Sequence, residues 1–125
     1  MKTTGLAYDP HEHATLLGVK VIYRDLQTAN GLWIPHLNTI CLDTRMSTIH
    51  ERSVLTHEIG HVSLGHTMAT PRQEIQADRW ASRKLINLIE LQVAATRSDD
   101  PGLWCHELNV SAKILTRYMK DHPAS

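Results

Sequence analysis

The sequence predicts an α+β fold in which a small three-stranded sheet packs on a pair of helices, with further helices toward the C-terminus. Two observations predict it. Three short segments rich in β-branched residues lie within residues 19–42, and long helical patterns begin only near residue 48. A length of 125 residues with 42% apolar residues fits one domain, residues 1–125, built around one core.

The first helix is predicted over residues 10–17. Asp9 is a favoured N-cap residue, and Pro10 suits the first helical position. Gly18 favours the end of a helix because glycine readily adopts the left-handed conformation found there. We therefore expect a short helix before the sheet.

Three strands are predicted at residues 19–23, 31–34 and 38–42. The first segment alternates in polarity, as is typical of a half-buried strand. Turn residues at 29–31 and 35–38 separate the segments, and the second turn is predicted to be a hairpin loop.

The central helix is predicted over residues 49–64. Thr48 and Glu51 have the spacing of a capping box, in which two side chains satisfy backbone N–H groups at the start of a helix. Gly65 then favours the helix end.

Three more helices are predicted to complete the chain. The first is long and continues without a break over residues 71–96, until the turn-forming residues 98–102 end it. Two shorter helices are expected at residues 103–108 and 111–120, with Ser111 as the N-cap of the last one.

The central helix carries H-E-I-G-H at residues 57–61. His57 and His61 are four residues apart, so on a helix both imidazoles point to one place, with Glu58 between them. In this H-E-x-x-H pattern the two histidines bind a divalent metal, usually zinc, and the glutamate is the general base. Chance would give the pattern in roughly three shuffled chains per hundred, so a third ligand is needed to support it.

Glu74 and Asp78 supply carboxylates at positions i and i+4 of the next helix. They share a face with Ala77 and Ala81, where two carboxylates would be costly to bury without a cation nearby. We therefore predict Glu74 as the third metal ligand. Asp78 is predicted to accept a hydrogen bond from the second ring nitrogen of one histidine and so orient it.

Two other interpretations of the histidines are considered. The first is an incidental pattern of satisfied core histidines, which the joint spacing of the two motifs disfavours. The second is a metzincin site, which fails because His66 lies nine rather than ten residues after His57 and no glycine occupies position 64. We expect His66 to be a residue at the helix end.

These motifs resemble the gluzincin metallopeptidases and, within them, the ImmA/IrrE family. The resemblance rests on H-E-I-G-H at residues 57–61, the L-x-H ending at His66, and E-x-x-A-D-x-W-A at residues 74–81. It continues in the closing segment at residues 107–117 and covers nearly the whole chain.

The resemblance implies a minimal zincin-like fold that holds Zn²⁺. It also implies a small phage-borne or bacterial zinc-dependent endopeptidase that hydrolyses a peptide bond in a regulatory protein, such as a DNA-binding helix-turn-helix repressor. An edge strand beside the zinc can hold extended substrate in gluzincins. A second function stays open, namely a zinc-containing anti-repressor or binding module without efficient proteolysis.

A further side chain is expected to donate a hydrogen bond to the oxyanion of the transition state. The sequence leaves five candidates for this donor. These are His36, His50, His106, Tyr118 and Arg79.

Composition limits the partners. The chain has 13 basic and 13 acidic residues and no basic run, so direct nucleic-acid binding is not expected. Cys41 and Cys105 lack C-x-x-C spacing and are predicted to be free thiols. The sequence shows no signal-peptide pattern and no apolar run of membrane-spanning length, so we expect a cytoplasmic protein without a membrane partner.

Overall fold

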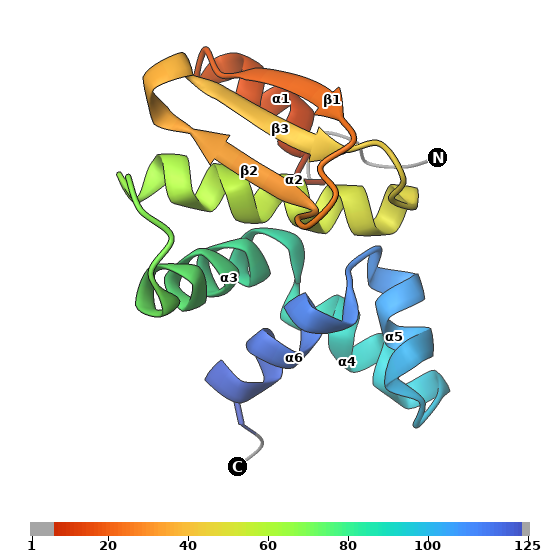
Figure 1. The fold of residues 1–125 in the computed structure, drawn as a ribbon. Helices are drawn as coiled ribbons and strands as arrows, with labels where there is room; N and C mark the ends of the chain where they lie inside the picture. The colour runs from red at the N-terminus through yellow and green to blue at the C-terminus, as the bar shows by residue number, and fades with distance from the viewer. Residues whose placement is uncertain (1–6, 124–125) are drawn as a thin grey trace.

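The computed structural model of the protein describes residues 7–123 and confirms the α+β fold (Figure 1). The elements follow in the order α1 (Pro10–Leu16), β1 (Lys20–Arg24), β2 (Gly31–Ile34), the 3-10 turn η2 (Pro35–Leu37), β3 (Thr39–Asp43), α2 (Thr48–Ser63), α3 (Pro71–Leu85), α4 (Leu88–Arg97), α5 (Pro101–Leu108) and α6 (Ala112–Asp121). The three strands predicted from the sequence all form, each within one or two residues of its expected bounds.

The sheet has the order β1-β3-β2, with β3 buried at its centre. β1 runs parallel to β3, and β2 runs antiparallel to it with Gly31 opposite Leu42. The predicted hairpin forms through η2, and Asn38 adopts the left-handed conformation that closes the turn. Because β2 pairs only with β3 among the described residues, its outer edge is free.

Helix α2 lies between the sheet and α3 (Figure 1). Leu55 and Ile59, one helical turn apart, are buried beneath the sheet. Thr56 and Gly60, on another side of the helix, are also buried, because α3 packs against that side. The Thr56 hydroxyl can be buried because it donates a hydrogen bond to the Arg52 carbonyl oxygen.

Gly60 sets the distance between α2 and α3. A Cβ atom at this position would lie 3.1 Å from the Ala77 carbonyl oxygen and 3.2 Å from Cε3 of Trp80. We expect Gly60→Val to lower the free energy of unfolding by about 1–3 kcal/mol, because the extra atoms overpack this contact. Urea unfolding checks the prediction, with Ser63→Val at an exposed position of the same helix as control. Equal unfolding midpoints for the two variants would contradict it.

The predicted capping box of α2 is wrong by one residue. Ser47 is the N-cap, and its side chain accepts a hydrogen bond from the His50 backbone N–H. The Glu51 carboxylate instead accepts hydrogen bonds from the Tyr23 hydroxyl and His11 Nε2. Glu51 therefore ties α2 to β1 and α1 rather than closing the cap.

The predicted helix over residues 71–96 is also wrong, because it is broken into α3 and α4. Ile86 and Asn87 are extended between them, and the Asn87 side chain caps α4 by accepting a hydrogen bond from the Glu90 backbone N–H. Ile86 is buried in a core shared with α5 and α6. Leu88, the first residue of α4 after the break, is 52% exposed.

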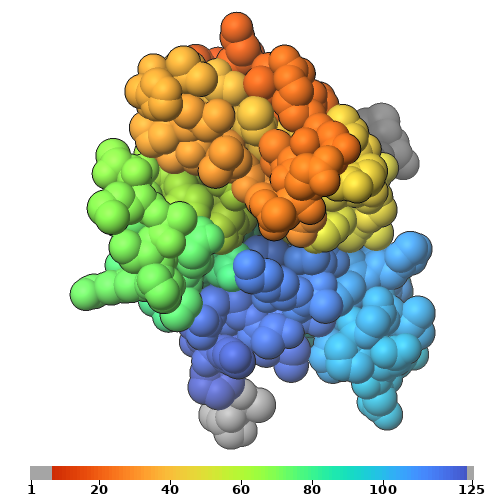
Figure 2. Space-filling model, in the orientation of Figure 1, coloured from red at the N-terminus to blue at the C-terminus, as the bar shows by residue number. Residues whose placement is uncertain are grey.

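The C-terminal helices close the lower half of the molecule, directly beneath the strands on the face shown in Figure 2. Ser111 is the N-cap of α6, as predicted, and its backbone N–H donates to the Ser53 hydroxyl on α2. α6 also packs along α3. This packing brings the start of α6 close to the histidines of α2.

Two other predictions concern the whole chain. Cys41 and Cys105 are free thiols, as predicted. Every helix within residues 7–123 is too short or too polar to cross a lipid bilayer.

Candidate metal centre

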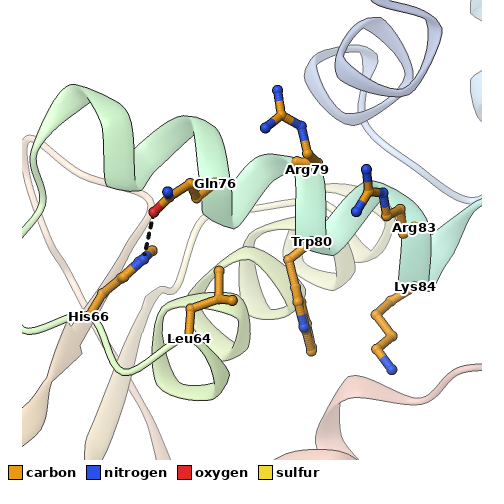
Figure 3. A pocket seen from close by; sticks show the side chains of 7 residues that line it. All are labelled: Leu64, His66, Gln76, Arg79, Trp80, Arg83 and Lys84. Carbon is orange, nitrogen blue, oxygen red and sulfur yellow. Dashed lines mark hydrogen bonds between the residues drawn. The ribbon is translucent and has the colours of Figure 1, made fainter. Parts of the chain in front are cut away.

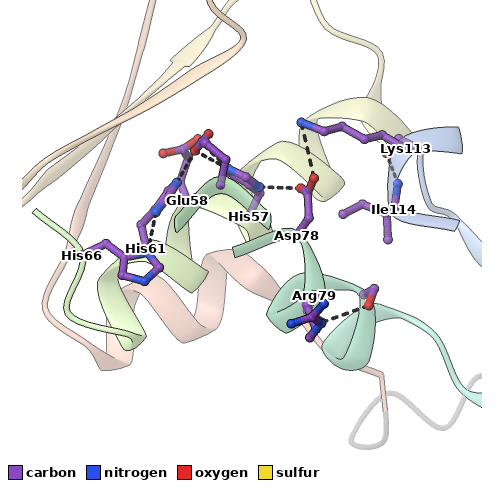
Figure 4. A network of polar contacts seen from close by, with 11 residues as sticks. His57, Glu58, His61, His66, Asp78, Arg79, Lys113 and Ile114 are labelled. Atoms are coloured by element: carbon purple, nitrogen blue, oxygen red, sulfur yellow. Dashed lines mark hydrogen bonds and ion pairs between the residues drawn. The ribbon is translucent and has the colours of Figure 1, made fainter. Parts of the chain in front are cut away.

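His57 and His61 lie side by side on α2, with Asp78 of α3 next to His57 (Figure 4), and both rings face the carboxylate of Glu74 on α3. Their rings are 4.8 Å apart between centroids, one helical turn from each other. Oε1 of Glu74 lies 3.2 Å from Nε2 of His57 and 2.6 Å from Nε2 of His61. The structure thus brings together the three residues predicted as metal ligands.

The donor set fits a divalent metal. Imidazole nitrogen and carboxylate oxygen are ligands that zinc prefers, and ligand atoms bound about 2.1 Å from one zinc ion lie about 3.4 Å apart in a tetrahedral site. Glu58 is an alternative third ligand by distance alone, since ligand atoms of His57, Glu58 and His61 lie within 4.8 Å of one another. Its oxygen is 3.9 Å from Nε2 of His57, however, whereas one oxygen of Glu74 reaches both rings. The geometry therefore favours Glu74 as ligand.

Asp78 fixes the orientation of His57. Its Oδ1 lies 2.6 Å from Nδ1 of His57, which leaves Nε2 to face Glu74. Burial opposes both charges and is the largest single influence on each pKa. The hydrogen bond and charge of His57, with Lys113, together outweigh it and lower the pKa of Asp78, while the neighbouring carboxylates together raise the pKa of His57. Nζ of Lys113 lies 3.5 Å from Oδ2 of Asp78 and adds to the lowering. The buried aspartate is thus held as an anion.

We expect Asp78→Ala to weaken metal affinity about 10- to 100-fold, because His57 loses the acceptor that sets its ring. Competition with a chromophoric chelator measures the affinity. Asp78→Asn, which keeps an oxygen acceptor, should lose less. An Asp78→Ala protein that held metal as tightly as the parent would contradict the assigned role.

His61 has its own partner, which the sequence analysis missed. Nδ1 of His61 lies 2.9 Å from Nδ1 of His66, and Nε2 of His66 lies 3.0 Å from Oε1 of Gln76. His66 is a buried member of the site and more than the helix-end residue expected. The L-x-H pattern was the available signal. Lys113 was missed as well, and nothing local could have indicated it, since α6 reaches the site only through tertiary packing.

Glu58 lies buried between His57 and the edge strand. Its side chain is so close to β2 that a Cβ atom on Gly31 would lie 3.1 Å from Cγ of Glu58. Burial raises the pKa of Glu58 to about 7, although the charge of His57 opposes the shift. A carboxyl group that titrates near neutrality is suited both to take up and to release a proton.

The raised pKa of Glu58 predicts a pH-dependent effect on stability. Between pH 4.5, the ordinary pKa of a glutamate, and about pH 7, the folded state keeps a proton on Glu58 that the unfolded state has released. Glu58 therefore destabilises the fold increasingly as the pH rises through this range. With chelator present, Glu58→Gln should therefore raise the free energy of unfolding at pH 8 by about 3 kcal/mol, and at pH 5 by under about 1 kcal/mol. Urea titrations at both pH values test this, and a gain that does not grow with pH would count against it.

A cavity of about 220 Å³ adjoins Glu58 between α2, β2 and the start of α6. Of the five candidate transition-state donors, only His50 lines it, and Lys113 joins it from α6. The other four are directed elsewhere. His36 and His106 are exposed on η2 and α5, Tyr118 is buried against His122, and Arg79 pairs with Asp121.

Comparison with known proteins agrees with this arrangement. The family model of M78 peptidases, described as the IrrE N-terminal-like domain, matches residues 14–119 and so includes every residue of the site. No curated protein matches the chain. The family is one of metallopeptidases, and a buried cluster of His57, Glu58 and His61 could hold the metal. The resemblance inferred from the motifs is confirmed, and the chain belongs to the M78 peptidase family with the IrrE N-terminal-like domain.

Proposed function

We propose that this protein is a cytoplasmic zinc-dependent endopeptidase that hydrolyses a peptide bond in a regulatory protein, such as a DNA-binding helix-turn-helix repressor. The observation that carries the proposal is the meeting of two imidazole Nε2 atoms at one oxygen of Glu74. Glu58 lies buried beside them in a chain of a metallopeptidase family.

His57, His61 and Glu74 would hold the zinc. Zinc bound there supplies Lewis-acid chemistry, which polarises a carbonyl oxygen and makes water easier to deprotonate. Asp78 keeps the Nδ1 proton of His57 in place, so that the Nε2 lone pair faces the site. The side chain of Glu74 is 39% exposed, which leaves one side of the site open to substrate.

Glu58 is the proposed general base. Its carboxylate takes a proton from the attacking water and returns it to the amine that leaves when the peptide bond breaks. The pKa of about 7 that burial gives Glu58 suits both steps at neutral pH. The side chains of His50 and Lys113 line the adjoining cavity and bring positive or proton-donating groups to the same region.

The outer edge of β2 is the proposed substrate platform. No other strand of residues 7–123 pairs with it, it lies beside Glu58, and it offers backbone N–H and C=O groups for pairing with an extended peptide. Gly31 at the start of β2 allows the strand to pass this close to α2, since a Cβ atom there would lie 2.6 Å from Cγ1 of Val54. The sequence could not identify this edge, because strand order depends on tertiary pairing.

Co-expression with one candidate helix-turn-helix repressor at a time tests the proposal, with the intact mass of the repressor as the readout. The parent protein should convert the repressor into two fragments whose masses sum to the repressor plus one water. Glu58→Gln should leave it whole. If the zinc-loaded parent leaves the repressor whole yet relieves repression, and Glu58→Gln does the same, the protein is an anti-repressor and the proposal fails.

A further inference from the structure

His66 and Gln76 form a chain of hydrogen bonds that ends on His61. His66 is 8% exposed and sits just after α2, while Gln76 lies on α3. Figure 4 shows His66 beside His61, and Figure 3 shows the bond from His66 to Gln76. Neither residue is among the proposed ligands.

The outer end of this chain fixes where its protons lie. Oε1 of Gln76 can only accept, so Nε2 of His66 carries a hydrogen and donates it. A neutral His66 then has an unprotonated Nδ1, which accepts from Nδ1–H of His61 across 2.9 Å. The lone pair of His61 is left on Nε2, which would then be free to bind zinc. Without a metal, Nε2 lies 2.6 Å from the Glu74 carboxylate and carries the proton of that hydrogen bond, so this order of donors and acceptors is that of the zinc-bound site.

The same chain runs beside a second cavity. His66 and Gln76 line a space of about 500 Å³ between the end of α2 and the face of α3 opposite Glu74 (Figure 3). The remaining lining residues are Leu64, Arg79, Trp80, Arg83 and Lys84. No carboxylate lines this cavity. The group that accepts the hydrogen bond from His66 is the neutral amide of Gln76, whereas the group that accepts from His57 is the anionic Asp78.

We propose that His66 and Gln76 are positioning residues that hold His61 in the Nδ1–H tautomer and aim its Nε2 at the metal. The inference rests on the proposed function for the identity of the metal site. The two ligand histidines are then oriented by different chemistry, His57 by a buried anion and His61 by a neutral relay. Because Gln76 borders an open cavity, water can partly replace its oxygen, so His66 has the larger effect.

The first test reads the tautomers directly in the zinc-loaded protein. Long-range ¹H–¹⁵N spectra of the histidine rings should show His66 as the Nε2–H tautomer and His61 as the Nδ1–H tautomer. Gln76→Met keeps the side-chain length but removes the acceptor, and should shift the ring signals of His66, whose Nε2–H loses its partner. Finding the Nδ1–H tautomer at His66 in the parent protein would overturn the proposal.

The second test measures zinc affinity by chelator competition. His66→Phe keeps a ring but no acceptor, and should weaken affinity about 10- to 100-fold. His66→Asn should recover part of the loss, because its amide oxygen can accept from His61. Gln76→Met should lose less than His66→Phe. Arg83→Met changes the same cavity without touching the relay and should bind zinc like the parent.

The outcomes separate the two proposals. If the parent binds no zinc, the proposed function fails, and the relay that rests on it fails as well. If the parent binds zinc and His66→Phe, folded by circular dichroism, binds it equally tightly, the relay is wrong and the proposed function stands. If His66→Phe does not fold, the comparison of His66→Asn with Gln76→Met decides in its place: parent-like affinity in both variants overturns the relay.

Discussion

Glu58→Gln should abolish peptide hydrolysis while the metal stays bound. The amide has nearly the shape of the carboxylate but cannot accept a proton from water, so kcat should fall by about 10²- to 10⁴-fold. The two imidazoles and Glu74 are left in place, so zinc content should match the parent. Cleavage measured by intact mass, together with zinc measured by elemental analysis, checks both halves of the prediction.

Glu51→Gln is the matched control for this change. Glu51 lies on the same helix but contacts α1 and β1 rather than the site, so its variant should cleave at the parental rate. Cleavage by Glu58→Gln at the same rate as Glu51→Gln would remove Glu58 from the mechanism and direct attention to another base.

His61→Ala should lose the metal altogether. It removes one of the three proposed ligands. It also leaves Nδ1 of His66 without its hydrogen-bond partner, which among the described residues is His61. His57→Ala should do the same, with Asp78 left beside Lys113. Elemental analysis after gel filtration should find less than about one tenth of the parental zinc, since a catalytic site needs three protein ligands.

His50→Ala is the control for the ligand variants. His50 lies on the same helix and lines the cleft, but it does not contact Glu74. Its variant should therefore keep full zinc content, whatever its effect on cleavage. Stoichiometric zinc in both His57→Ala and His61→Ala would mean that the ion binds elsewhere.

The sequence predicted those parts of the fold and site that depend on regular spacing. The i, i+4 pairs on α2 and α3 predicted two side chains on one face of each helix, and the structure brings these four side chains into contact. The β-branched segments predicted the strands for a similar reason. The strand order and the free edge of β2 depended on which strand pairs with which, and no local pattern contains that information.

The errors have local physical causes. Ser47 and Thr48 are both good N-caps, and the structure uses Ser47 because Glu51 is engaged by Tyr23 and His11. Residues 85–88 look helical, yet Asn87 caps a new helix while Ile86 enters the shared core.

On a helical wheel of α2, Gly60 lies outside the arc that carries Leu55 and Ile59, so the sequence pattern alone does not indicate that it is buried. In the structure, glycine marks the place where α3 comes closest. A glycine inside a helix indicates a possible close contact with another element, but the sequence does not say which element makes that contact.

X-ray absorption at the zinc edge tests the central claim most directly, that His57, His61 and Glu74 converge on one ion. The parent protein should contain one zinc per chain, with two imidazole nitrogens and the remaining ligands oxygen at about 2.0–2.2 Å. Glu58→Gln should give the same spectrum. A zinc-saturated protein whose spectrum shows fewer than two imidazole ligands, or a parent that binds no stoichiometric zinc, would contradict the account.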